Sequence, residues 1–409
     1  MFKKQYYLIF LLVIIASLLI LINYNDSKKI VDQNGNEFVG NEACRNCHAE
    51  LVDSYLHTDH FLDSRIADLN AVKGKFIRDS DYVIYNNDFR NKVVMRQYHG
   101  DLYQSHYVDG KEVMSKKMDI IIGSGRKGQS YAYWNNNSLF QLPVSFYTPL
   151  DQWIASPGYS TKSPDFSRVI TVRCLECHAT YAKVHEDTAN NKLNFEKNQL
   201  ILGITCEKCH GAGGKHVEHH LQYKTEKGGK YIINPKKLTS TQQLDACSLC
   251  HGGIMKSKLP PFSFQTGDTL SKFFKLNNVV DTSVDVHANQ IALLSKSKCF
   301  RISNNMTCST CHNVHQNSRG DLKVYATKCM SCHVDYKKLH KVDVKYNDEF
   351  YINNCIDCHM PNSPSKTMTV ETDFISGSKP VLIRTHYIKT YADQQKKIVA
   401  DLYKLVGSK

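Results

Sequence analysis

The sequence predicts a fold of mainly short α-helices and loops, with a small antiparallel β-rich subdomain and one N-terminal transmembrane helix. Three features predict it: a Cys-x-x-Cys-His motif that recurs seven times, a strand-like stretch between the first two motifs, and a charge-free apolar run near the N-terminus. The last six motifs all fall within residues 174–359. We expect so little chain per motif to form short helices and loops, with sparse extended structure.

Each motif places two thiols and one imidazole on a single short segment. The seven copies use fourteen of the fifteen cysteines. Cys-x-x-Cys-His is the attachment signature of c-type haem. Two cysteines three residues apart lie on one helical turn, where each thiol can bond one haem vinyl group, and the next imidazole becomes the proximal iron ligand. The sequence therefore predicts a multihaem cytochrome c with seven covalently bound haem c groups, whose helices and loops surround a haem core.

The motifs are numbered 1 to 7 along the chain. The predicted attachment residues are Cys44, Cys47, Cys174, Cys177, Cys206, Cys209, Cys247, Cys250, Cys308, Cys311, Cys329, Cys332, Cys355 and Cys358. The predicted proximal ligands are His48, His178, His210, His251, His312, His333 and His359. Zinc ribbons and thioredoxin-like sites also use Cys-x-x-Cys, but they do not require a histidine directly after the second cysteine. A disulfide framework would show mixed spacings instead of a single one.

A haem iron with protein ligands on both faces needs a second histidine. Twelve of the 19 histidines lie outside the motifs, which is more than seven irons require. His315 follows motif 5 too closely to cap the same haem, so we expect it to reach a neighbouring haem. His216 follows a glycine-rich segment that lets the backbone pack tightly against a ring. The predicted distal ligands are His60, His216, His287, His315, His340 and His386, and the seventh stays open among His57, His185, His219 and His220.

The N-terminus has the pattern of a membrane segment. Lys3 and Lys4 precede an uncharged run, Tyr6–Ile22, which at 1.5 Å per residue spans roughly 25 Å as a helix. No Ala-x-Ala pattern follows, so an uncleaved signal anchor is favoured over a cleaved signal peptide. The lysines predict a single-pass protein of the inner (cytoplasmic) membrane, with the haem domain in the periplasm or cell envelope.

Residues between motifs 1 and 2 have a different composition. Short runs rich in β-branched and aromatic residues alternate with turn-forming segments such as Asn86-Asn87-Asp88 and Asp109-Gly110, a pattern typical of antiparallel hairpins. The predicted domains are a signal anchor at 1–24, a tether with the first haem segment at 25–80, a β-rich subdomain at 81–150, a six-haem domain at 151–390 and an amphipathic C-terminal helix at 391–409.

The formal net charge of +13 does not by itself indicate a nucleic-acid partner. Each haem carries two propionates, so seven haems would offset most of this charge. The sequence also lacks a basic run with interleaved aromatic residues. We therefore predict no nucleic-acid partner.

The motifs together resemble the multihaem cytochromes c of the superfamily that includes the tetrahaem cytochrome of nitrifiers and hydroxylamine oxidoreductase. The resemblance rests on motif 1 followed by Thr58-Asp59-His60, on motif 3 with His216, on motif 5 with His315, and on Arg384-Thr385-His386. It implies that His60, His216, His315, His287 and His386 are distal ligands and that neighbouring haems stack in pairs. The Cys-x-x-Cys-Lys haem of ammonia-forming nitrite reductases is not found here.

The favoured function is electron transfer by a membrane-anchored cytochrome of the cell envelope, with a quinol-linked donor or other cytochromes as partners. The alternative is a multihaem redox enzyme that acts on hydroxylamine, nitrite or a sulfur oxyanion at one five-coordinate haem. The two differ in iron coordination, and no residue is nominated as catalytic.

Overall fold

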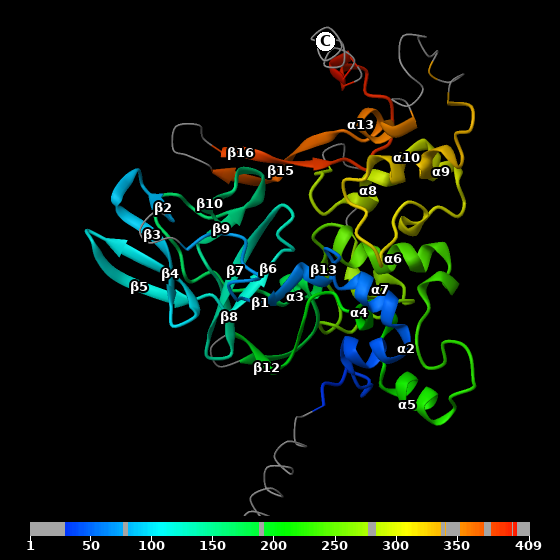
Figure 1. Ribbon diagram of the computed structural model, residues 1–409, viewed down its shortest axis with the longest axis horizontal. Helices are drawn as coiled ribbons and strands as arrows, with labels where there is room; N and C mark the ends of the chain where they lie inside the picture. Colours follow the sequence, from blue (N-terminus) through cyan, green and yellow to red (C-terminus); the bar gives the residue numbers. More distant parts are fainter. Residues whose placement is uncertain are drawn as a thin grey trace, which may run out of the picture.

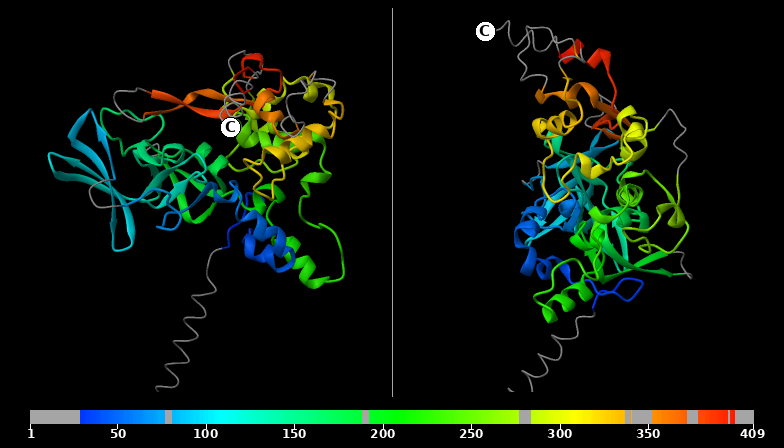
Figure 2. Two further views of the ribbon diagram at one scale, coloured as in Figure 1. Left: turned by 45° about the horizontal axis from the view of Figure 1, so that its top comes forward. Right: turned by 90° about the vertical axis from the view of Figure 1, so that its right-hand side faces the viewer.

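The structure is a computed structural model that describes residues 29–76, 81–187, 192–276, 284–336, 340, 352–371, 378–394 and 396–398. It has two parts that lie side by side (Figure 1). One is rich in strands and holds β1 to β10. The other carries most of the short helices, and the two views of Figure 2 show the same division. A late hairpin, β15–β16, extends from the helical part along the strand-rich part (Figure 1).

Two antiparallel sheets form the strand-rich part. The six-stranded sheet has the order β1-β6-β7-β9-β10, with β8 also paired to β7, and the four-stranded sheet has the order β2-β3-β4-β5. The strands are β1 (Ser64–Ile66), β2 (Tyr82–Tyr85), β3 (Asp88–Tyr98), β4 (Asp101–Val108), β5 (Lys111–Lys117), β6 (Ile120–Ile122), β7 (Gly128–Asn135), β8 (Ser138–Gln141), β9 (Val144–Tyr147) and β10 (Gln152–Ala155). The 3-10 helices η1 (Phe61–Asp63) and η2 (Thr148–Leu150) flank them.

Tight turns set the register of the four-stranded sheet. The chain reverses at Asn86-Asn87, His99-Gly100 and Asp109-Gly110, where every residue has a positive φ between 48° and 88°. Two-residue turns of this kind match the twist of the paired strands and favour Asn, Asp and Gly. The strands close directly on these turns, with Tyr98 opposite Asp101 and Val108 opposite Lys111.

A shared apolar core joins the two sheets. Tyr85 and Val93 of the four-stranded sheet pack with Tyr131 and Val144 of the six-stranded sheet, and all four side chains are fully buried. The buried amide of Gln104 bridges the sheets as well. It donates to the carbonyl of Val144 at 2.8 Å and accepts from the amide of the same residue at 3.0 Å. Both polar groups of the amide are thus satisfied inside the core, as buried polar groups must be.

The helical part contains short helices and three further hairpins. The helices are α2 (Gly40–Tyr55), α3 (Val172–His178), α4 (Cys206–His210), α5 (Gly214–Gln222), η3 (Pro235–Lys237), α6 (Ser240–His251), α7 (Leu270–Phe273), α8 (Gln290–Leu294), α9 (Lys298–Ile302), η4 (Cys308–Thr310), α10 (Leu322–Met330) and α13 (Cys355–His359). The hairpins are β11 (Ala179–Asp187) with β12 (Lys192–Leu202), β13 (Lys256–Ser257) with β14 (Phe274–Lys275), and β15 (Asn362–Glu371) with β16 (Ser378–Arg384).

The predicted fold class was wrong in its proportion of strand. Beyond the β-rich stretch of the sequence, β11 and β12 form a long hairpin between motifs 2 and 3, and β15 and β16 form another after motif 7. The sequence predicted sparse extended structure here because little chain separates the motifs. The hairpin β11–β12 nevertheless fits between His178 of motif 2 and Cys206 of motif 3, because two paired strands satisfy each other's backbone hydrogen bonds within a short stretch of chain.

The predicted membrane-spanning helix at 1–24 lies outside the described residues. Within the described part of the chain, no helix combines the length and the apolar composition needed to cross a bilayer. The predicted transmembrane helix and single-pass inner-membrane location therefore gain no support and are withdrawn. Of the predicted C-terminal helix, residues 392–394 and 396–398 are helical and the remainder from 399 lies outside the described residues. The other domain boundaries stay predictions.

Candidate haem-binding sites

Four of the seven motifs share a local geometry. Motifs 2, 3, 4 and 7 each end a helix at their histidine, so that one helical turn holds both cysteines and the imidazole. Motif 1 lies in α2, whose backbone departs from helical angles at His48 (φ −123°, ψ 41°). Motif 5 forms η4, and motif 6 begins in the last turn of α10. All fifteen cysteines are described, and all are free thiols, so the structure gives no disulfide framework.

Motif 2 is held firmly against the strand-rich part. Leu175, the residue after its first cysteine, is buried among Ile120, Ala132 and Leu139 of the six-stranded sheet. The strand-rich part therefore fixes the orientation of α3. It contributes to the candidate sites as a scaffold.

Thiols of different motifs approach one another in pairs. Thiols of motifs 1 and 3, 2 and 4, 4 and 5, and 6 and 7 lie close enough for one to shift the pKa of the other; the pairs are Cys44 with Cys206, Cys177 with Cys250, Cys247 with Cys308, and Cys329 with Cys355. Cys209 of motif 3 also interacts with Cys247 of motif 4, and Cys311 of motif 5 with Cys332 of motif 6. The motifs thus form one connected set in which motif 4 has the most neighbours.

Imidazole rings from outside the motifs face four proximal histidines. The ring centroids are 6.2 Å apart for His315 and His210, 6.1 Å for His386 and His312, 6.1 Å for His60 and His251, and 5.8 Å for His340 and His359. Metal–imidazole bonds of about 2.0 Å place two rings on opposite sides of one metal with centroids roughly 6 Å apart. The four separations therefore fit an iron held between two histidines.

The remaining two predicted distal ligands, His216 and His287, are not among these four facing pairs. Burial lowers the pKa of His287; the charge of Asp285 opposes this, and the nearby ring of His178 of motif 2 adds to it. His216 lies on α5 beside His220, with ring centroids 4.7 Å apart. The structure thus brings His60, His315, His340 and His386 opposite proximal histidines of motifs 4, 3, 7 and 5, and it places His287 near motif 2.

Hydrogen bonds show which ring nitrogen each histidine leaves available. Nδ1 of His210 donates to the carbonyl of Ile233 at 2.7 Å, and Nδ1 of His359 donates to that of Lys389 at 3.0 Å. Among the predicted distal ligands, Nδ1 of His216 donates to the carbonyl of Lys230 at 2.8 Å, and Nδ1 of His340 to that of Tyr336 at 2.7 Å. A ring held through Nδ1 presents Nε2 to a metal, and such partners are usual for metal-binding histidines.

The availability of Nε2 also narrows the choice of the seventh distal ligand, which the sequence left open among His57, His185, His219 and His220. His185 uses Nε2 to contact Glu196 at 2.5 Å, and His219 uses Nε2 to contact Glu226 at 2.8 Å. Both rings therefore have the nitrogen that would face an iron already engaged. His220 instead has a buried Nε2 without a hydrogen-bond partner among the described residues. A buried nitrogen of this kind costs free energy unless something binds it, so His220 fits a ligand better than His185 or His219.

Burial, together with neighbouring imidazoles, keeps two of the facing imidazoles neutral. Burial, with a smaller effect from the neighbouring His60, lowers the pKa of His251 to about 4. Burial and the neighbouring His312 likewise lower the pKa of His386 to about 4. Both rings are therefore uncharged near pH 7, which is the state that can donate a nitrogen lone pair to iron.

Motif 2 differs in the partner of its histidine. Nδ1 of His178 donates to the carboxylate of Asp63 at 2.8 Å. Burial lowers the pKa of His178, but the hydrogen bond and charge of Asp63 outweigh it and raise the pKa above its ordinary value. A carboxylate partner makes an imidazole a stronger electron donor to a metal than a backbone carbonyl does.

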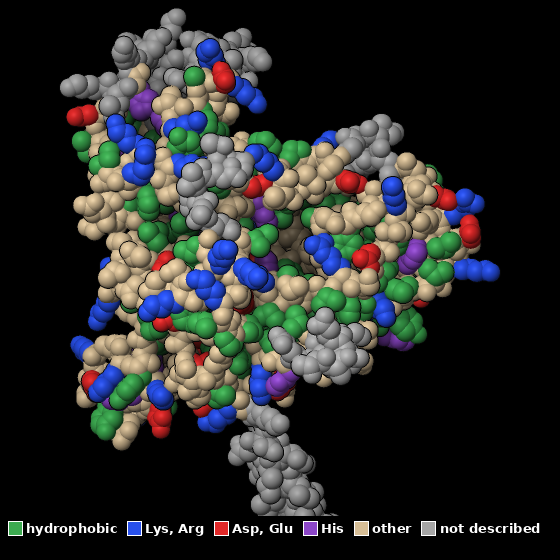
Figure 3. All heavy atoms as spheres, turned by 180° about the vertical axis from the view of Figure 1, so that it is seen from behind, with side chains coloured by type: hydrophobic (Ala, Val, Ile, Leu, Met, Phe, Trp, Pro, Cys, Tyr) green, Lys and Arg blue, Asp and Glu red, His purple; other side chains and the backbone are tan. Residues whose placement is uncertain are grey.

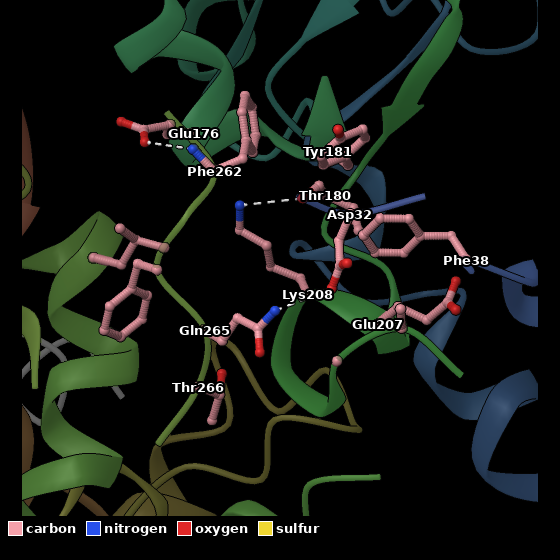
Figure 4. Close-up of a pocket in the computed structure, with 14 residues that line it drawn as sticks. Asp32, Phe38, Glu176, Thr180, Tyr181, Glu207, Lys208, Phe262, Gln265 and Thr266 are labelled. Carbon is pink, nitrogen blue, oxygen red and sulfur yellow. Dashed lines mark hydrogen bonds between the residues drawn. The ribbon is translucent and has the colours of Figure 1, made fainter. Parts of the chain in front are cut away.

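A small cavity of about 50 Å³ lies between motifs 2, 3 and 4 (Figure 4). Lys208 crosses it, with Nζ donating to the carbonyl of Thr180 at 3.3 Å and lying 5.0 Å from the ring centroid of Phe262. The carboxylate of Glu176 accepts from the amide of Phe262 at 3.1 Å. Ligand pockets usually have about 300–1,000 Å³, and the side chains of Lys208 and Glu176 are already hydrogen-bonded to backbone groups. We interpret the cavity as a packed junction between motifs.

Another carboxylate at this junction connects motif 3 to motif 1. Glu207 accepts hydrogen bonds from the backbone amides of Val39 at 2.9 Å, Gly40 at 3.0 Å and Gly213 at 2.8 Å. These amides precede α2 and α5, so one buried side chain positions both helices. Sequence reasoning missed Glu207 because its partners are backbone groups that no sequence pattern reveals.

Comparisons with known proteins agree with this geometry. Residues 157–211, which contain motifs 2 and 3, match the family described as cytochrome c554 and c-prime. The chain is 24% identical over 225 residues to the multiheme cytochrome MtrA of Shewanella baltica (strain OS185). That match covers 50% of this chain and 62% of MtrA, so the chain spans less than two thirds of the relative's length.

Among solved structures, the fold is similar to that of the outer cell wall cytochrome OcwA. The TM-score is 0.53 with 14% sequence identity, and the alignment covers 86% of this chain and 79% of that one. Together the comparisons support covalently bound haem c. The narrower resemblance to hydroxylamine oxidoreductase is not confirmed by them.

Proposed function

Since the chain is a multihaem c-type cytochrome, we propose that it carries electrons between other cytochromes along a row of seven haem c groups. Haem c supplies an iron that can change its charge by one electron. The two cysteines of each motif would hold the group covalently, and the histidine of the motif would bind the iron. Each of five haems would receive its second iron ligand from one histidine outside the motifs: His60, His315, His340, His386 or His287. His216 or His220 on α5 would serve a further haem.

The observation that carries this proposal is the set of facing imidazoles. Four pairs have the separation that an iron with two histidine ligands needs. Two histidine ligands fill the coordination sphere, so such an iron exchanges electrons without binding a substrate, and its potential is low compared with an iron bound by methionine. This favours an electron carrier over an enzyme.

The contacts between motifs suggest the order of the row. They give the sequence 1, 3, 4, 5, 6 and 7, with motif 2 branching from motif 4. In Figure 1, α2 and α4 lie toward one end of the helical part, α6 lies in the middle, and α10 and α13 lie toward the other end. The protein's contribution would be to hold neighbouring groups close together and to set their potentials through ligands and burial.

Low-temperature EPR of the oxidised protein tests the proposal. After haem quantification, which should give seven per chain, a pure electron carrier should give only low-spin ferric signals. Distal histidines are named above for six of the seven irons, so the experiment also tests whether the seventh iron has a second ligand. A high-spin signal equivalent to about one haem would contradict a pure carrier and indicate an open coordination position. Nitrite, hydroxylamine and sulfur oxyanions would then be tested as substrates.

The carboxylate beside motif 2 leads to a second prediction. Asp63→Asn should raise the midpoint potential of one haem by on the order of tens of millivolts, because a neutral amide no longer strengthens His178 as a donor to ferric iron. Spectroelectrochemical titration would measure the shift. Asp68→Asn is the matched control, since the Asp68 carboxylate accepts from the backbone amides of Asn70 and Ala71 and contacts no motif histidine among the described residues. Equal potentials in the two variants would rule out the role of Asp63.

A further inference from the structure

A lysine-rich hairpin lies on the surface next to motif 4. Strand β13 pairs with β14, with Lys256 opposite Lys275 and Ser257 opposite Phe274. Lys258 extends the pairing through its backbone amide, which donates to the carbonyl of Phe273 at 2.8 Å. Figure 3 shows several Lys and Arg side chains close together on the surface of the helical part, seen from the side opposite to that of Figure 1.

The two faces of the hairpin have opposite character. On the inner face, Met255 and Phe274 are buried against Leu249 and Leu270, in a cluster that also includes Cys250 of motif 4. The outer face is exposed and carries Lys256, Lys258 and Lys275, and Lys272 is exposed nearby on α7. Alternation along the strand thus separates an apolar anchor on motif 4 from a basic outer surface.

Few acidic residues lie near these lysines along the chain. Residues 252–276 contain four lysines and a single acidic residue, Asp268, whose carboxylate accepts from the backbone amide of Gln265. Within the described part of the chain, none of these lysines forms an ion pair; Lys258 donates to the carbonyl of Ser271. Like charges directly opposite each other, as at Lys256 and Lys275, destabilise a pair of strands. This pairing of Lys256 with Lys275 therefore costs stability.

Apolar side chains accompany the lysines. Ile254 is 86% exposed and Leu276 is 43% exposed, and both lie at the ends of the paired segments. Apolar groups with a charged rim are typical of protein-binding surfaces. Complexes between redox proteins have small interfaces and depend on electrostatic attraction.

From these observations we infer that the outer face of the β13–β14 hairpin docks a redox protein with an acidic surface. Together, Ile254, Leu276 and the four lysines form the docking patch. Because the inner face packs on the helix of motif 4, a partner held there would exchange electrons with the haem at motif 4. This inference rests on the proposed electron-carrier function and specifies one entry or exit point for it.

The test uses the full haem-loaded chain and reduced flavodoxin, an acidic flavoprotein, as the probe. Stopped-flow absorbance gives the second-order rate constant for haem reduction at low ionic strength. In Lys256→Glu/Lys275→Glu the rate constant should fall about tenfold or more, because the attraction that brings the two proteins together is reversed. Lys256→Gln/Lys275→Gln should give a smaller decrease, and the wild-type rate should fall as salt is added.

A matched charge reversal elsewhere on the protein distinguishes the effect of the docking patch on the rate constant from the effect of net charge. Lys111 and Lys162 are exposed on the strand-rich part, and Lys111→Glu/Lys162→Glu changes the net charge by the same amount. We expect less than about a twofold effect from it. Haem content and midpoint potentials should be the same in all variants. Equal decreases in both reversed variants, or an unchanged rate in Lys256→Glu/Lys275→Glu, would overturn the docking patch.

Three outcomes concern other interpretations. If phosphatidylserine vesicles bind the wild type and not Lys256→Glu/Lys275→Glu, while both react equally with flavodoxin, the patch is a lipid contact and the inference fails. If flavodoxin reduces the wild type and both variants equally fast, the patch fails but the carrier function stands. If the wild-type haems exchange electrons with no redox protein, the carrier function fails as well.

Discussion

Replacing His386 with alanine should convert one low-spin haem into a high-spin haem. His386 faces His312 of motif 5 with ring centroids 6.1 Å apart, and its Nδ1 is buried without a partner among the described residues. Its backbone is held independently, because Ser297 donates to the His386 carbonyl at 3.1 Å and Arg384 donates to the carbonyls of Ile356 and Met360. The substitution therefore removes an imidazole and leaves the surrounding backbone in place.

EPR and the absorption spectrum measure this change. We expect a new high-spin ferric signal equivalent to about one haem per chain, and a higher midpoint potential for that haem because it has lost a donor ligand. Added imidazole should restore the low-spin spectrum. His106→Ala is the matched control, since His106 lies on β4 and its Nε2 contacts Asn91 at 2.8 Å. A fully low-spin His386→Ala protein without added imidazole would show that His386 is not a ligand.

Removing the attachment cysteines of motif 4 should divide the row of haems. Motif 4 contacts motifs 2, 3 and 5, so Cys247→Ala/Cys250→Ala interrupts every connection between motifs 1 to 3 and motifs 5 to 7 that the thiol contacts indicate. With limiting reductant, the wild type should reach its equilibrium distribution of electrons in one fast phase. The variant should show an additional phase at least about tenfold slower, because electrons must pass between the two groups without the intermediate centre.

The control for this experiment removes a terminal haem instead. Cys355→Ala/Cys358→Ala also lowers the haem content by one, but motif 7 lies at the end of the row, so the remaining six should still equilibrate in one fast phase. Far-UV circular dichroism checks that both variants keep the fold. If both variants equilibrate as fast as the wild type, the proposed order of motifs is wrong.

Some of the candidate iron ligands could be predicted from the sequence, and the choice among others required the structure. Sequence spacing alone indicated that His315 would reach a neighbouring haem, and the structure places it opposite His210 of motif 3. Sequence alone could not choose among His57, His185, His219 and His220, because the choice depends on which ring nitrogen is engaged. Glu196 and Glu226, which engage His185 and His219, are brought near them by a hairpin and by a loop.

The fold was predicted less well than the chemistry. Turn residues such as Asn86-Asn87 and Asp109-Gly110 indicated the hairpins of the four-stranded sheet because a two-residue turn depends on local conformation. The hairpins β11–β12 and β15–β16 were missed. Their stability depends on packing against distant elements, as where Val370 and Val381 are buried against Ile154 of β10.

The sequence by itself determined the covalent chemistry of this protein. Two cysteines and a histidine within five residues lie on one turn wherever the segment is helical, so seven motifs suffice to predict attachment sites and proximal ligands. Only the tertiary structure decided which histidine faces which motif and which motifs are neighbours. Those relations join residues far apart along the chain, such as His60 with His251 and His312 with His386, and they arise from how the helices and hairpins pack.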